Sequence, residues 1–295
     1  MSGRLTVGEI LPLSTRFLKE RGSGSPRLDA ELLTADVLGV RRLDLYLAPE
    51  RPLTPAETDT LREAVRRRGR GEPIAYIRGR REFFGLELAV TPAVLIPRPE
   101  TETVVDAALA WLRERGGEAP RIVDAGTGSG AIACALAANL PAARVVATDV
   151  STEALAVAAR NVATHGLADR MRLVACNLLD GLEAGDVPDL IISNPPYIAE
   201  SERPLMDPGV VAFEPPIALF SGAEGTDTTF ALIDAARSRL RPGGALVVEV
   251  GTPAQRDRVR ARMAERIAPD VRPLADPAGA IRGFLVETPN PRPEE

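Results

Sequence analysis

The chain has 295 residues, of which 45% are hydrophobic, and its formal net charge is −5. A chain of this length and composition can bury a full core and leave room for a smaller second unit, so we expect two domains. Lysine and arginine dominate the binding of nucleic-acid backbones. The acidic balance therefore argues against a protein whose main activity is to grip DNA or RNA.

The cysteines and the apolar stretches indicate the compartment. Cys134 and Cys176 are too few for a disulfide framework, and we expect both to be small buried apolar residues. No stretch approaches the ~18 apolar residues of a membrane span, and the first residues lack the charged start and apolar run of a signal peptide. We expect a cytoplasmic protein with no membrane segment.

Residues 1–76 carry helix signals and are predicted to form a helical domain. Thr6 and Thr54 each begin a Thr-x-x-Glu capping box, and Gly39 is a natural stop for the helix "PRLDAELLTADVL". Pro12 is expected to kink or delay the first helix. The many arginines between positions 62 and 81 are interpreted as a solvated face, with a docking face for an acidic partner as the alternative.

Residues 77–100 are predicted to form a linker. Its "REFFGLELAV" has apolar residues at period two, which predicts a hairpin around Gly85. From residue 101 to 289, predicted strands at 121–125, 144–149, 171–176, 189–193 and 245–250 alternate with helices, and closing strands lie near 271 and 284. This alternation predicts an α/β domain with a parallel sheet, helices on both faces and a crevice at the carboxyl ends of the strands. Residues 290–295 are interpreted as a frayed tail.

A glycine-rich loop, "DAGTGSGAIA", joins the strand at 121–125 to the next helix. Gly126, Gly128 and Gly130 let the backbone approach a ligand closely, and the helix start offers free amide donors. The following strand ends at Asp149, whose carboxylate can accept hydrogen bonds from ribose hydroxyls. The loop predicts a nucleotide-like cofactor, but its spacing also satisfies a dinucleotide pattern, so an NAD enzyme stays open at this point.

The stretch "LIISNPPYIAE" ends a predicted strand in a stiff loop. Asn194 can offer its side-chain oxygen to one N–H of an amino group, and the Pro195 carbonyl can accept the other. Both acceptors gain strength as that nitrogen becomes positive in the transition state, and the Tyr197 ring can pack on a planar group. The loop predicts methyl transfer to a glutamine amide, an adenine amine or a guanine amine. An NAD enzyme offers no role for this loop.

Other catalytic chemistries find no support in the sequence. His165, the single histidine, precedes Gly166 at a predicted helix end and is interpreted as structural. No Cys/His cluster has metal-ligand spacing, and no Ser/His/Asp arrangement is available. We therefore expect no metal site.

The stretch "GEPIAYIRGRREFFGLELAVTPAVLIPRPETE", together with "DAGTGSGAIA" and "NPPYI…FEP", closely resembles the release factor glutamine methyltransferases, the HemK/PrmC type, over essentially the whole chain. The resemblance implies a Rossmann-like class I methyltransferase domain with a mostly parallel seven-stranded sheet. It implies S-adenosyl-L-methionine as the cofactor and, as the substrate, the glutamine of the Gly-Gly-Gln motif in class I peptide-chain release factors. The helical domain would help to dock this protein, and we expect a monomer without stably bound nucleic acid.

The resemblance also assigns roles to residues. Cofactor binding falls to Gly126, Thr127, Gly128, Ser129, Gly130, Asp149, Asn177, Leu178 and Asn194. Asn194 and Pro195 would be catalytic, and the glutamine would be held by Asn194, Pro195, Pro196 and Tyr197. Two further elements look like the family's substrate side, Arg98-Pro99-Glu100 and Phe213-Glu214-Pro215.

The chain departs from the family pattern at three places. Asn177 stands where an aspartate is commoner, "DPAGAIRGFLVE" fits the last strands loosely, and Pro12 interrupts the first helix. Alternatives remain open: methylation of a glutamine in a ribosomal protein, methylation of DNA adenine or ribosomal RNA guanine, and a non-catalytic binding protein. The nucleic-acid alternative would need a target-reading domain or a basic groove.

Overall fold

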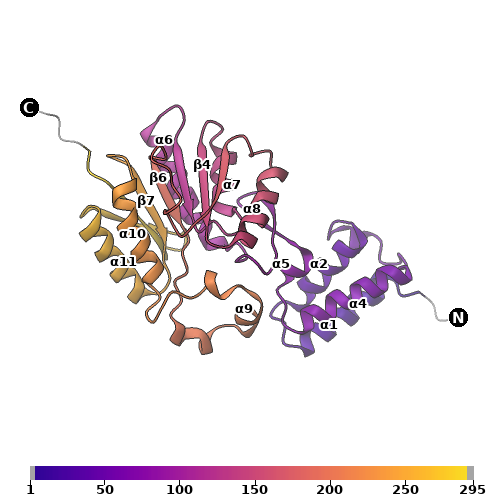
Figure 1. Ribbon diagram of the computed structural model, residues 1–295. Coiled ribbons are helices and arrows are strands. Elements are labelled where there is room, and N and C mark those ends of the chain that lie inside the picture. Colours follow the sequence, from indigo (N-terminus) through magenta and orange to yellow (C-terminus); the bar gives the residue numbers. More distant parts are fainter. Residues whose placement is uncertain (1–3, 291–295) are drawn as a thin grey trace, which may run out of the picture. The chain divides into compact units, whose positions relative to one another are not determined.

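The computed structural model describes residues 4–290, which fall into two compact units (Figure 1). The helical unit runs to Arg80 and also takes in Asp207–Phe213, while the second unit comprises Arg81–Met206 and the chain from Glu214 onward. From the sequence we predicted that the helical domain ends at residue 76, and we did not predict that Asp207–Phe213 belongs to it. That segment approaches the helical unit closely, because a Cβ added to Gly209 would lie 2.8 Å from the Gly71 carbonyl oxygen.

The helical unit is built around the apolar faces of its longer helices. Buried leucines such as Leu18, Leu33 and Leu61 form its core. The helices are α1 (Val7–Glu20), α2 (Pro26–Leu38), α3 (Asp44–Leu47), α4 (Pro55–Gly69), α5 (Ile74–Arg78) and α9 (Pro208–Phe213). Both capping boxes and the stop at Gly39 are confirmed, since Gly39 caps α2 with a left-handed φ of 62°.

Pro12 lies inside α1, which begins at Val7, so it does not delay the first helix, and the expected kink stays a prediction. Proline cannot donate the backbone hydrogen bond that Gly8 would accept. The start of α1 is held from outside the helix instead. Val7 N donates to Arg51 O at 3.0 Å and Gly8 N donates to Pro49 O at 2.8 Å. These two bonds satisfy first-turn donors and fix where the helix begins.

Arginines of the 62–81 stretch form ion pairs within the helical unit. Arg68 Nε lies 2.6 Å from Asp29 of α2. Arg78 and Arg80 both bind Asp36 of α2, each at 2.6 Å. Burial raises the pKa of the Asp36 carboxyl, but the hydrogen bonds and charges of the two arginines outweigh it and leave the pKa lowered. These three arginines therefore serve the packing of α2 against its neighbours.

The second unit contains a sheet of seven strands in the order β5-β4-β3-β6-β7-β9-β8. The strands are β3 (Arg121–Ala125), β4 (Arg144–Asp149), β5 (Met171–Ala175), β6 (Leu190–Ser193), β7 (Ala245–Glu249), β8 (Val271–Ala275) and β9 (Ile281–Glu287). The first five in the spatial order are parallel, and β9 runs antiparallel to β7 and β8. The expected mostly parallel seven-stranded sheet is confirmed.

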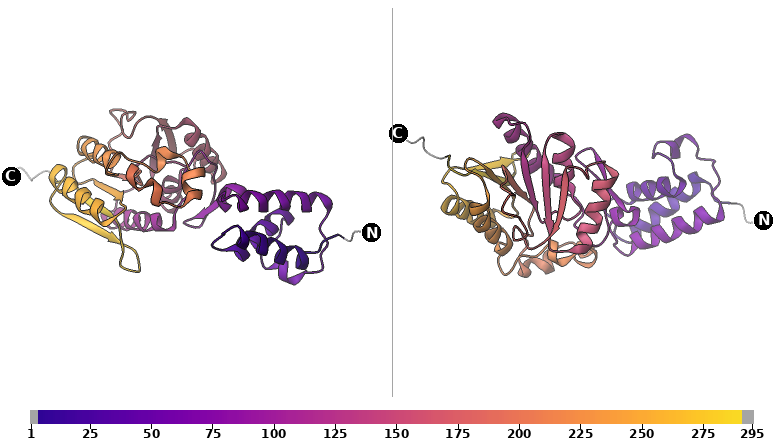
Figure 2. Two further views of the ribbon diagram at one scale, coloured as in Figure 1. Left: turned by 90° about the horizontal axis from the view of Figure 1, so that it is seen from below. Right: turned by 45° about the horizontal axis from the view of Figure 1, so that its top comes forward.

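Helices cover both faces of this sheet (Figure 2). Buried residues of α6 (Glu102–Arg115), α7 (Ala131–Asn139) and α8 (Thr152–Thr164) share one core with the sheet. Residues of α10 (Asp227–Arg239) and α11 (Pro253–Arg266) share the other. Short 3₁₀ turns form η1 (Pro99–Thr101), η2 (Glu200–Leu205) and η3 (Pro216–Ala218). No helix among residues 4–290 has the length and apolarity needed to cross a membrane.

The strand order reverses between β3 and β6. The chain moves outward from β3 through β4 to β5, then returns to lay β6 on the other side of β3. Parallel strands end at the same edge, and the loops that follow neighbouring strands diverge at such a reversal and leave a crevice. The sites predicted after β3, β4, β5 and β6 are thereby brought to one edge of the sheet.

The predicted hairpin is formed by β1 (Arg80–Phe83) and β2 (Leu86–Ala89). Its two turn residues, Phe84 and Gly85, both have positive φ, at 53° and 76°. Positive φ at both central positions matches the strand twist of a tight hairpin but is unfavourable for an aromatic residue. The Phe84 N–H donates to the Glu102 carboxylate at 3.0 Å, which holds the turn in place.

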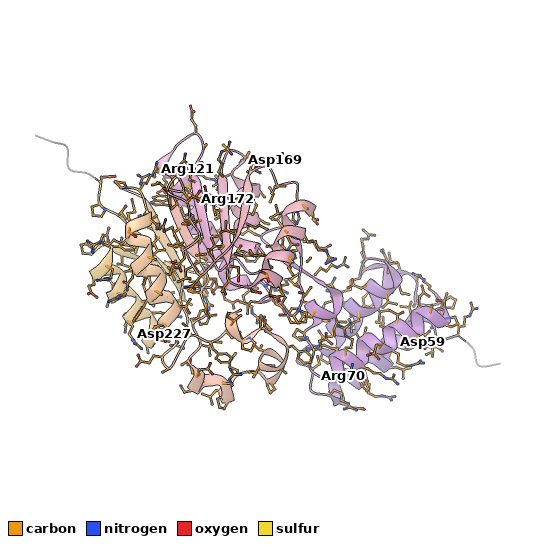
Figure 3. The ribbon with its side chains drawn as sticks, in the orientation of Figure 1. Asp59, Arg70, Arg121, Asp169, Arg172 and Asp227 are labelled. Atoms are coloured by element: carbon orange, nitrogen blue, oxygen red, sulfur yellow. The ribbon has the colours of Figure 1, made fainter. Side chains whose placement is uncertain are left out.

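We expect Asp36→Asn to lower the free energy of unfolding by about 2 kcal/mol, because it removes the charge that Arg78 and Arg80 share. Urea denaturation of the full chain, followed by circular dichroism, measures this. Asp59→Asn is the matched control, since Asp59 is exposed on α4 (Figure 3) and forms an exposed ion pair with Arg62. It should cost less than about 0.5 kcal/mol. Equal losses in the two variants would contradict the structural role of Asp36.

Candidate active site

A cavity of about 290 Å³ opens at the edge where β3, β4, β5 and β6 end. Its wall includes residues from the loops after all four strands, from the 93–101 segment and from 215–218. The predicted residues among its lining are Gly126, Thr127, Gly128, Ser129, Asp149, Asn177, Leu178, Asn194 and Pro196. Three predicted residues, Gly130, Pro195 and Tyr197, are not among the lining residues.

The glycine loop is held to the sheet by its backbone. Gly126 N and Thr127 N donate to Thr148 O at 2.9 and 2.8 Å. Gly126 and Gly128 have φ of 73° and 55°, and a Cβ added to either would meet no heavy atom within 4 Å. The loop therefore presents bare backbone and open space to the cavity, as a cofactor cradle requires.

Gly130 packs against a neighbouring helix. It has φ of 80° at the start of α7, and a Cβ added there would lie 3.3 Å from the Ala158 Cβ of α8. The missing side chain lets α7 and α8 approach each other closely. Its contact with a cofactor stays a prediction.

Asp149 ties the glycine loop to the turn after β4. Its Oδ2 accepts from Gly128 N at 2.8 Å and its Oδ1 accepts from Ser151 N at 2.9 Å. A carboxylate has about four lone-pair directions, so both oxygens can accept further hydrogen bonds. The carboxylate is fixed beside the cavity and fits the expected contact with two ribose hydroxyls.

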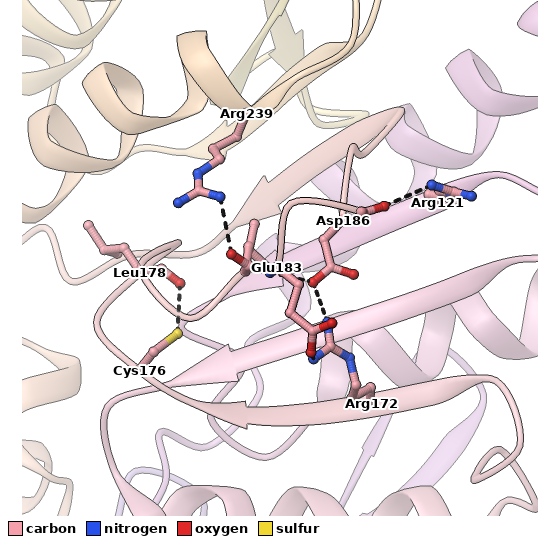
Figure 4. Close-up of polar contacts among 9 residues, drawn as sticks. Arg121, Arg172, Cys176, Leu178, Glu183, Asp186 and Arg239 are labelled. Carbon is pink, nitrogen blue, oxygen red and sulfur yellow. Dashed lines mark hydrogen bonds and ion pairs between the residues drawn. The ribbon is translucent and has the colours of Figure 1, made fainter.

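The loop after β5 contains a strained residue. Leu178 has φ of 46°, a conformation that L side chains adopt rarely. Its carbonyl accepts hydrogen bonds from the Thr148 hydroxyl at 2.7 Å and from the Cys176 thiol at 3.5 Å (Figure 4). Such backbone strain persists only where surrounding contacts maintain it, and it is common at ligand sites. Asn177 beside it is exposed and lines the cavity, so the Asn177-Leu178 pair can clamp a planar base.

Only one cysteine is as buried as expected. Cys134 on α7 is fully buried, but Cys176 is half-buried, so the expectation fails there. Burial, followed by the charge of Asp124, raises the pKa of the Cys134 thiol to about 12. Cys134 therefore stays a neutral core residue at physiological pH.

Asn194 reaches the cavity from the end of β6. Its Nδ2 donates to the Thr101 hydroxyl oxygen at 3.1 Å. Glu249, the last residue of β7, is 3% exposed, and its burial raises the pKa of its carboxyl to about 7, with Thr101 opposing the rise. Sequence reasoning missed Thr101 and Glu249. The available signals were the threonine in "RPETE" and a carboxylate that ends a buried strand at the sheet edge where the site lies.

The side chain of Tyr197 packs against Gly251, near Glu249. A Cβ added to Gly251 would lie 2.6 Å from the Tyr197 ring, and Gln255 donates a hydrogen bond to the Tyr197 carbonyl. Burial, with the charge of Glu249 as the next cause, raises the pKa of the Tyr197 phenol to about 12. The phenol is neutral at physiological pH, so the ring offers a packing surface and not a base.

The structure joins the two elements that resemble the family's substrate side. Glu214 is 3% exposed, and its carboxylate pairs with Arg98 and accepts from Ile96 N at 3.3 Å. Arg98 and Pro215 both line the cavity. Pro99 and Glu100 are exposed at the start of η1, and Phe213 belongs to the helical unit. The ion pair of half-buried Arg98 with buried Glu214 fixes one wall of the cavity.

Asn161 on α8 is a second residue that the sequence did not reveal. It is 1% exposed, accepts from Ala89 N at 2.7 Å and donates to Ala89 O and Ser129 O at 3.0 and 2.8 Å. It therefore connects the hairpin to the glycine loop. His165, at the end of the same helix, contacts the Glu87 carbonyl at 3.0 Å and is structural, as predicted.

The fold and the cavity define a class: a Rossmann-like class I methyltransferase that uses S-adenosyl-L-methionine. Solved structures agree on the fold. The hMettl16 catalytic domain solved with a 3'UTR hairpin has a TM-score of 0.56 at 16% identity over 95% of both chains. A 16S rRNA methyltransferase of T. thermophilus in complex with AdoMet and guanosine has a TM-score of 0.53 at 18% identity over 71% of this chain and 49% of that one.

Sequence comparisons identify the family. Residues 9–79 match the PrmC N-terminal domain and residues 104–206 the methyltransferase small domain. The release factor glutamine methyltransferase of Rhodopirellula baltica is 42% identical to this chain, over 83% of this chain and 83% of its own length. That of Bordetella pertussis is 43% identical, over 89% of this chain and 96% of its own length. The chain belongs to the release factor glutamine methyltransferase family. The NAD-enzyme interpretation and the non-catalytic one are therefore set aside.

We expect Asp124→Asn to change how stability depends on pH. Asp124 lies beneath the glycine loop, accepts from Thr127 Oγ1 at 2.6 Å, and its burial raises the pKa of the carboxyl from 3.8 to about 7. A raised native pKa means that wild type loses stability as pH rises from about 4 to about 7. Asparagine removes this loss, which amounts to about 4 kcal/mol at most.

The comparison is made by urea denaturation at pH 5 and pH 8. Relative to wild type, Asp124→Asn should gain stability at pH 8. Asp169→Asn removes one charge at an exposed position (Figure 3) and should follow the wild-type profile. Parallel profiles for Asp124→Asn and wild type would show that Asp124 does not titrate with a raised pKa.

Proposed function

We propose that this protein methylates the side-chain amide nitrogen of the glutamine in the Gly-Gly-Gln motif of class I peptide-chain release factors. Relatives named for that reaction match most of the chain at 42–44% identity. The single structural observation that supports it most is the orientation of Asn194, whose NH₂ group is bound to Thr101. The opposite, accepting edge of its amide is left for an incoming amino group.

When bound, S-adenosyl-L-methionine would supply a sulfonium methyl for transfer to the amide nitrogen; the sulfur would leave as a neutral thioether and the nitrogen would release one proton to solvent. An amide nitrogen is a poor nucleophile because its lone pair is delocalised. The chain's residues must therefore hold it in line and exclude water. Asn194 Oδ1 and the Pro195 carbonyl accept hydrogen bonds from the two N–H groups of the substrate amide. Pro196 and Tyr197 confine the planar amide.

The cofactor site is formed by the same cavity. Gly126, Thr127, Gly128 and Ser129 supply backbone at close range, and Asp149 accepts from the ribose. Asn177 and Leu178 contact the adenine. An asparagine at position 177 can accept the hydrogen bond of the exocyclic amine through its side-chain oxygen.

The helical unit is the part of the chain that we assign to docking the release factor. The reaction places the protein in the cytoplasm, where translation ends. We expect the monomer to be the active species, with no stably bound nucleic acid. The formal net charge of −5 favours a protein substrate over a nucleic acid.

The direct test mixes the protein with labelled S-adenosyl-L-methionine and a class I release factor. Label should appear on the Gly-Gly-Gln peptide and be absent when that glutamine is replaced by glutamate. A panel with a ribosomal protein, DNA and ribosomal RNA separates the alternatives. Label on another acceptor and none on the release factor would reject the proposal.

Asn194→Ala should lower turnover by at least ~10²-fold, because it removes a polar contact that is placed before the reaction begins. Cofactor affinity should fall much less, as measured by calorimetry. Asn139→Ala is the matched control at an exposed position on α7, where the side chain only donates to the Ala135 carbonyl. Wild-type turnover in Asn194→Ala would remove this residue from catalysis.

A further inference from the structure

The loop Asn194–Tyr197 is held at both of its ends. At its start, Asn194 Nδ2 donates to the Thr101 hydroxyl oxygen at 3.1 Å. At its end, the Tyr197 backbone carbonyl accepts a hydrogen bond from Gln255 Nε2 at 2.5 Å. The two prolines between these ends have a fixed φ, so the loop has little internal freedom. The contacts at the two ends therefore set where the loop lies.

The Gln255 side chain has its direction fixed by its own helix. Gln255 lies in the first turn of α11 and is 5% exposed. Its Oε1 accepts from Thr252 N at 3.0 Å, which is the bond of a helix capping box. A backbone N–H can only donate and a backbone carbonyl can only accept. The amide must therefore turn its oxygen to Thr252 and its NH₂ group to the Tyr197 carbonyl.

Two glycines enclose the contact between Gln255 and Tyr197. A Cβ added to Gly225 would overlap both the Tyr197 carbonyl oxygen and Gln255 Nε2. A Cβ added to Gly251 would lie 2.5 Å from Gln255 Oε1 and 2.6 Å from the Tyr197 ring. Bare backbone therefore closes around the hydrogen bond from two sides. A hydrogen bond in such a dry environment is stronger than one in water.

The residue after the loop is also anchored. Ile198 N donates to Leu219 O at 2.9 Å, and Ser221 N donates to Ile198 O at 3.0 Å. These bonds join the exit of the loop to the segment after η3, and η3 contributes to the cavity lining. Of the three contacts at this end of the loop, only that of Gln255 comes from a side chain. It is therefore the contact that a single substitution can remove.

Capping of α11 alone does not explain an amide at position 255. Glutamate serves the same purpose, and its charge is favourable at a helix start. The capping boxes of α1 and α4 use glutamate, since Glu9 accepts from Thr6 N at 2.8 Å and Glu57 accepts from Thr54 N at 2.7 Å. Gln255 is the only glutamine in the chain. What its amide adds to a carboxylate is a donor, and that donor binds Tyr197.

We propose that Gln255 is a positioning residue that holds Tyr197, and with it the loop Asn194–Tyr197, in place for methyl transfer. Gln255 is not among the residues that line the cavity, so it acts through the loop and not on the ligands. The part of the loop in receiving a glutamine amide rests on the proposed function. The anchoring itself applies to any amino group that the loop receives.

Gln255→Glu separates positioning from capping. The variant keeps an oxygen for Thr252 N and removes the donor, so a carboxylate faces the Tyr197 carbonyl and displaces it. At pH 8, kcat should fall at least about 10-fold, because a small misplacement of reacting groups is costly. The KM for the release factor and the Kd for S-adenosyl-L-methionine, measured by calorimetry, should change less than about 3-fold, since Gln255 does not line the cavity.

The matched control is Asn139→Asp. It makes the same exchange of an amide for a carboxylate at an exposed position on α7, where the side chain donates only to the Ala135 carbonyl. Its kcat should equal that of wild type. A role of Gln255 limited to capping predicts wild-type kcat in Gln255→Glu as well, and that result would overturn the positioning role.

Gly251→Ala tests the same contact without a new charge. Gly251 has no positive φ, so its backbone accepts alanine, but the added Cβ meets the Tyr197 ring and Gln255 Oε1. Its kcat should fall about 10-fold. Gly185→Ala is the matched control, because Gly185 also has no positive φ and a Cβ there meets no heavy atom within 4 Å. If Gln255→Glu does not fold, wild-type kcat in Gly251→Ala would overturn the proposal.

A measurement without any acceptor tests the anchoring directly. Because the chain has one glutamine, labelling of glutamine side chains with ¹⁵N gives the NH₂ signals of Gln255 alone. In the full protein, these protons should exchange with solvent at least about 10-fold more slowly than those of a glutamine in an unstructured peptide. Gly251→Ala should reduce this protection, and Gly185→Ala should retain it.

The outcomes separate the two proposals. No label on any release factor, together with protected Gln255 protons, would reject the proposed function and support the anchoring. Label on the release factor, together with Gln255 protons that exchange as fast as those of the peptide, would support the proposed function and overturn the anchoring.

Discussion

Parallel hydrogen bonding of five strands is the constraint on which the site depends. Because β3, β4, β5, β6 and β7 run in one direction, their carboxyl ends meet at one edge. The glycine loop, Asp149, the Asn177-Leu178 pair, Asn194 and Glu249 each stand at or just after such an end. Residues more than a hundred positions apart thereby become neighbours, and the reversal between β3 and β6 leaves room for a ligand between them.

Two buried carboxylates hold the loops around that opening. Asp124 binds the glycine loop through Thr127, and Glu214 binds the 96–98 segment through Arg98. Each burial opposes ionisation and costs free energy unless partners offset it. Arg98 supplies an opposite charge for Glu214, whereas Asp124 accepts from two neutral donors, Thr127 Oγ1 and Ala133 N. The buried carboxylates thereby keep the loops at the site in a fixed geometry.

Several features were predictable because they depend on local chemistry. Glycine spacing, capping boxes and the alternation of strands and helices follow from backbone conformation and burial, so the sheet was predicted and nine of the twelve predicted site residues line the cavity. Pro12 was misjudged because the bonds from Val7 and Gly8 to residues 49–51 are not local. The packing of Gly130 against Ala158 was not predictable, because Ala158 lies on another helix. Cys176 was expected to be buried because a strand position says nothing of what covers it.

The sequence by itself determined the Asn-Pro-Pro-Tyr loop, its accepting groups and its place after a buried strand, because proline stiffness and strand alternation are written in adjacent residues. Only the tertiary structure decided which way the Asn194 amide points. Thr101, to which the Asn194 amide donates, lies 93 residues before it. No periodicity or motif connects such positions, because the hydrogen bond between them exists only once the 93–101 segment lies beside the end of β6.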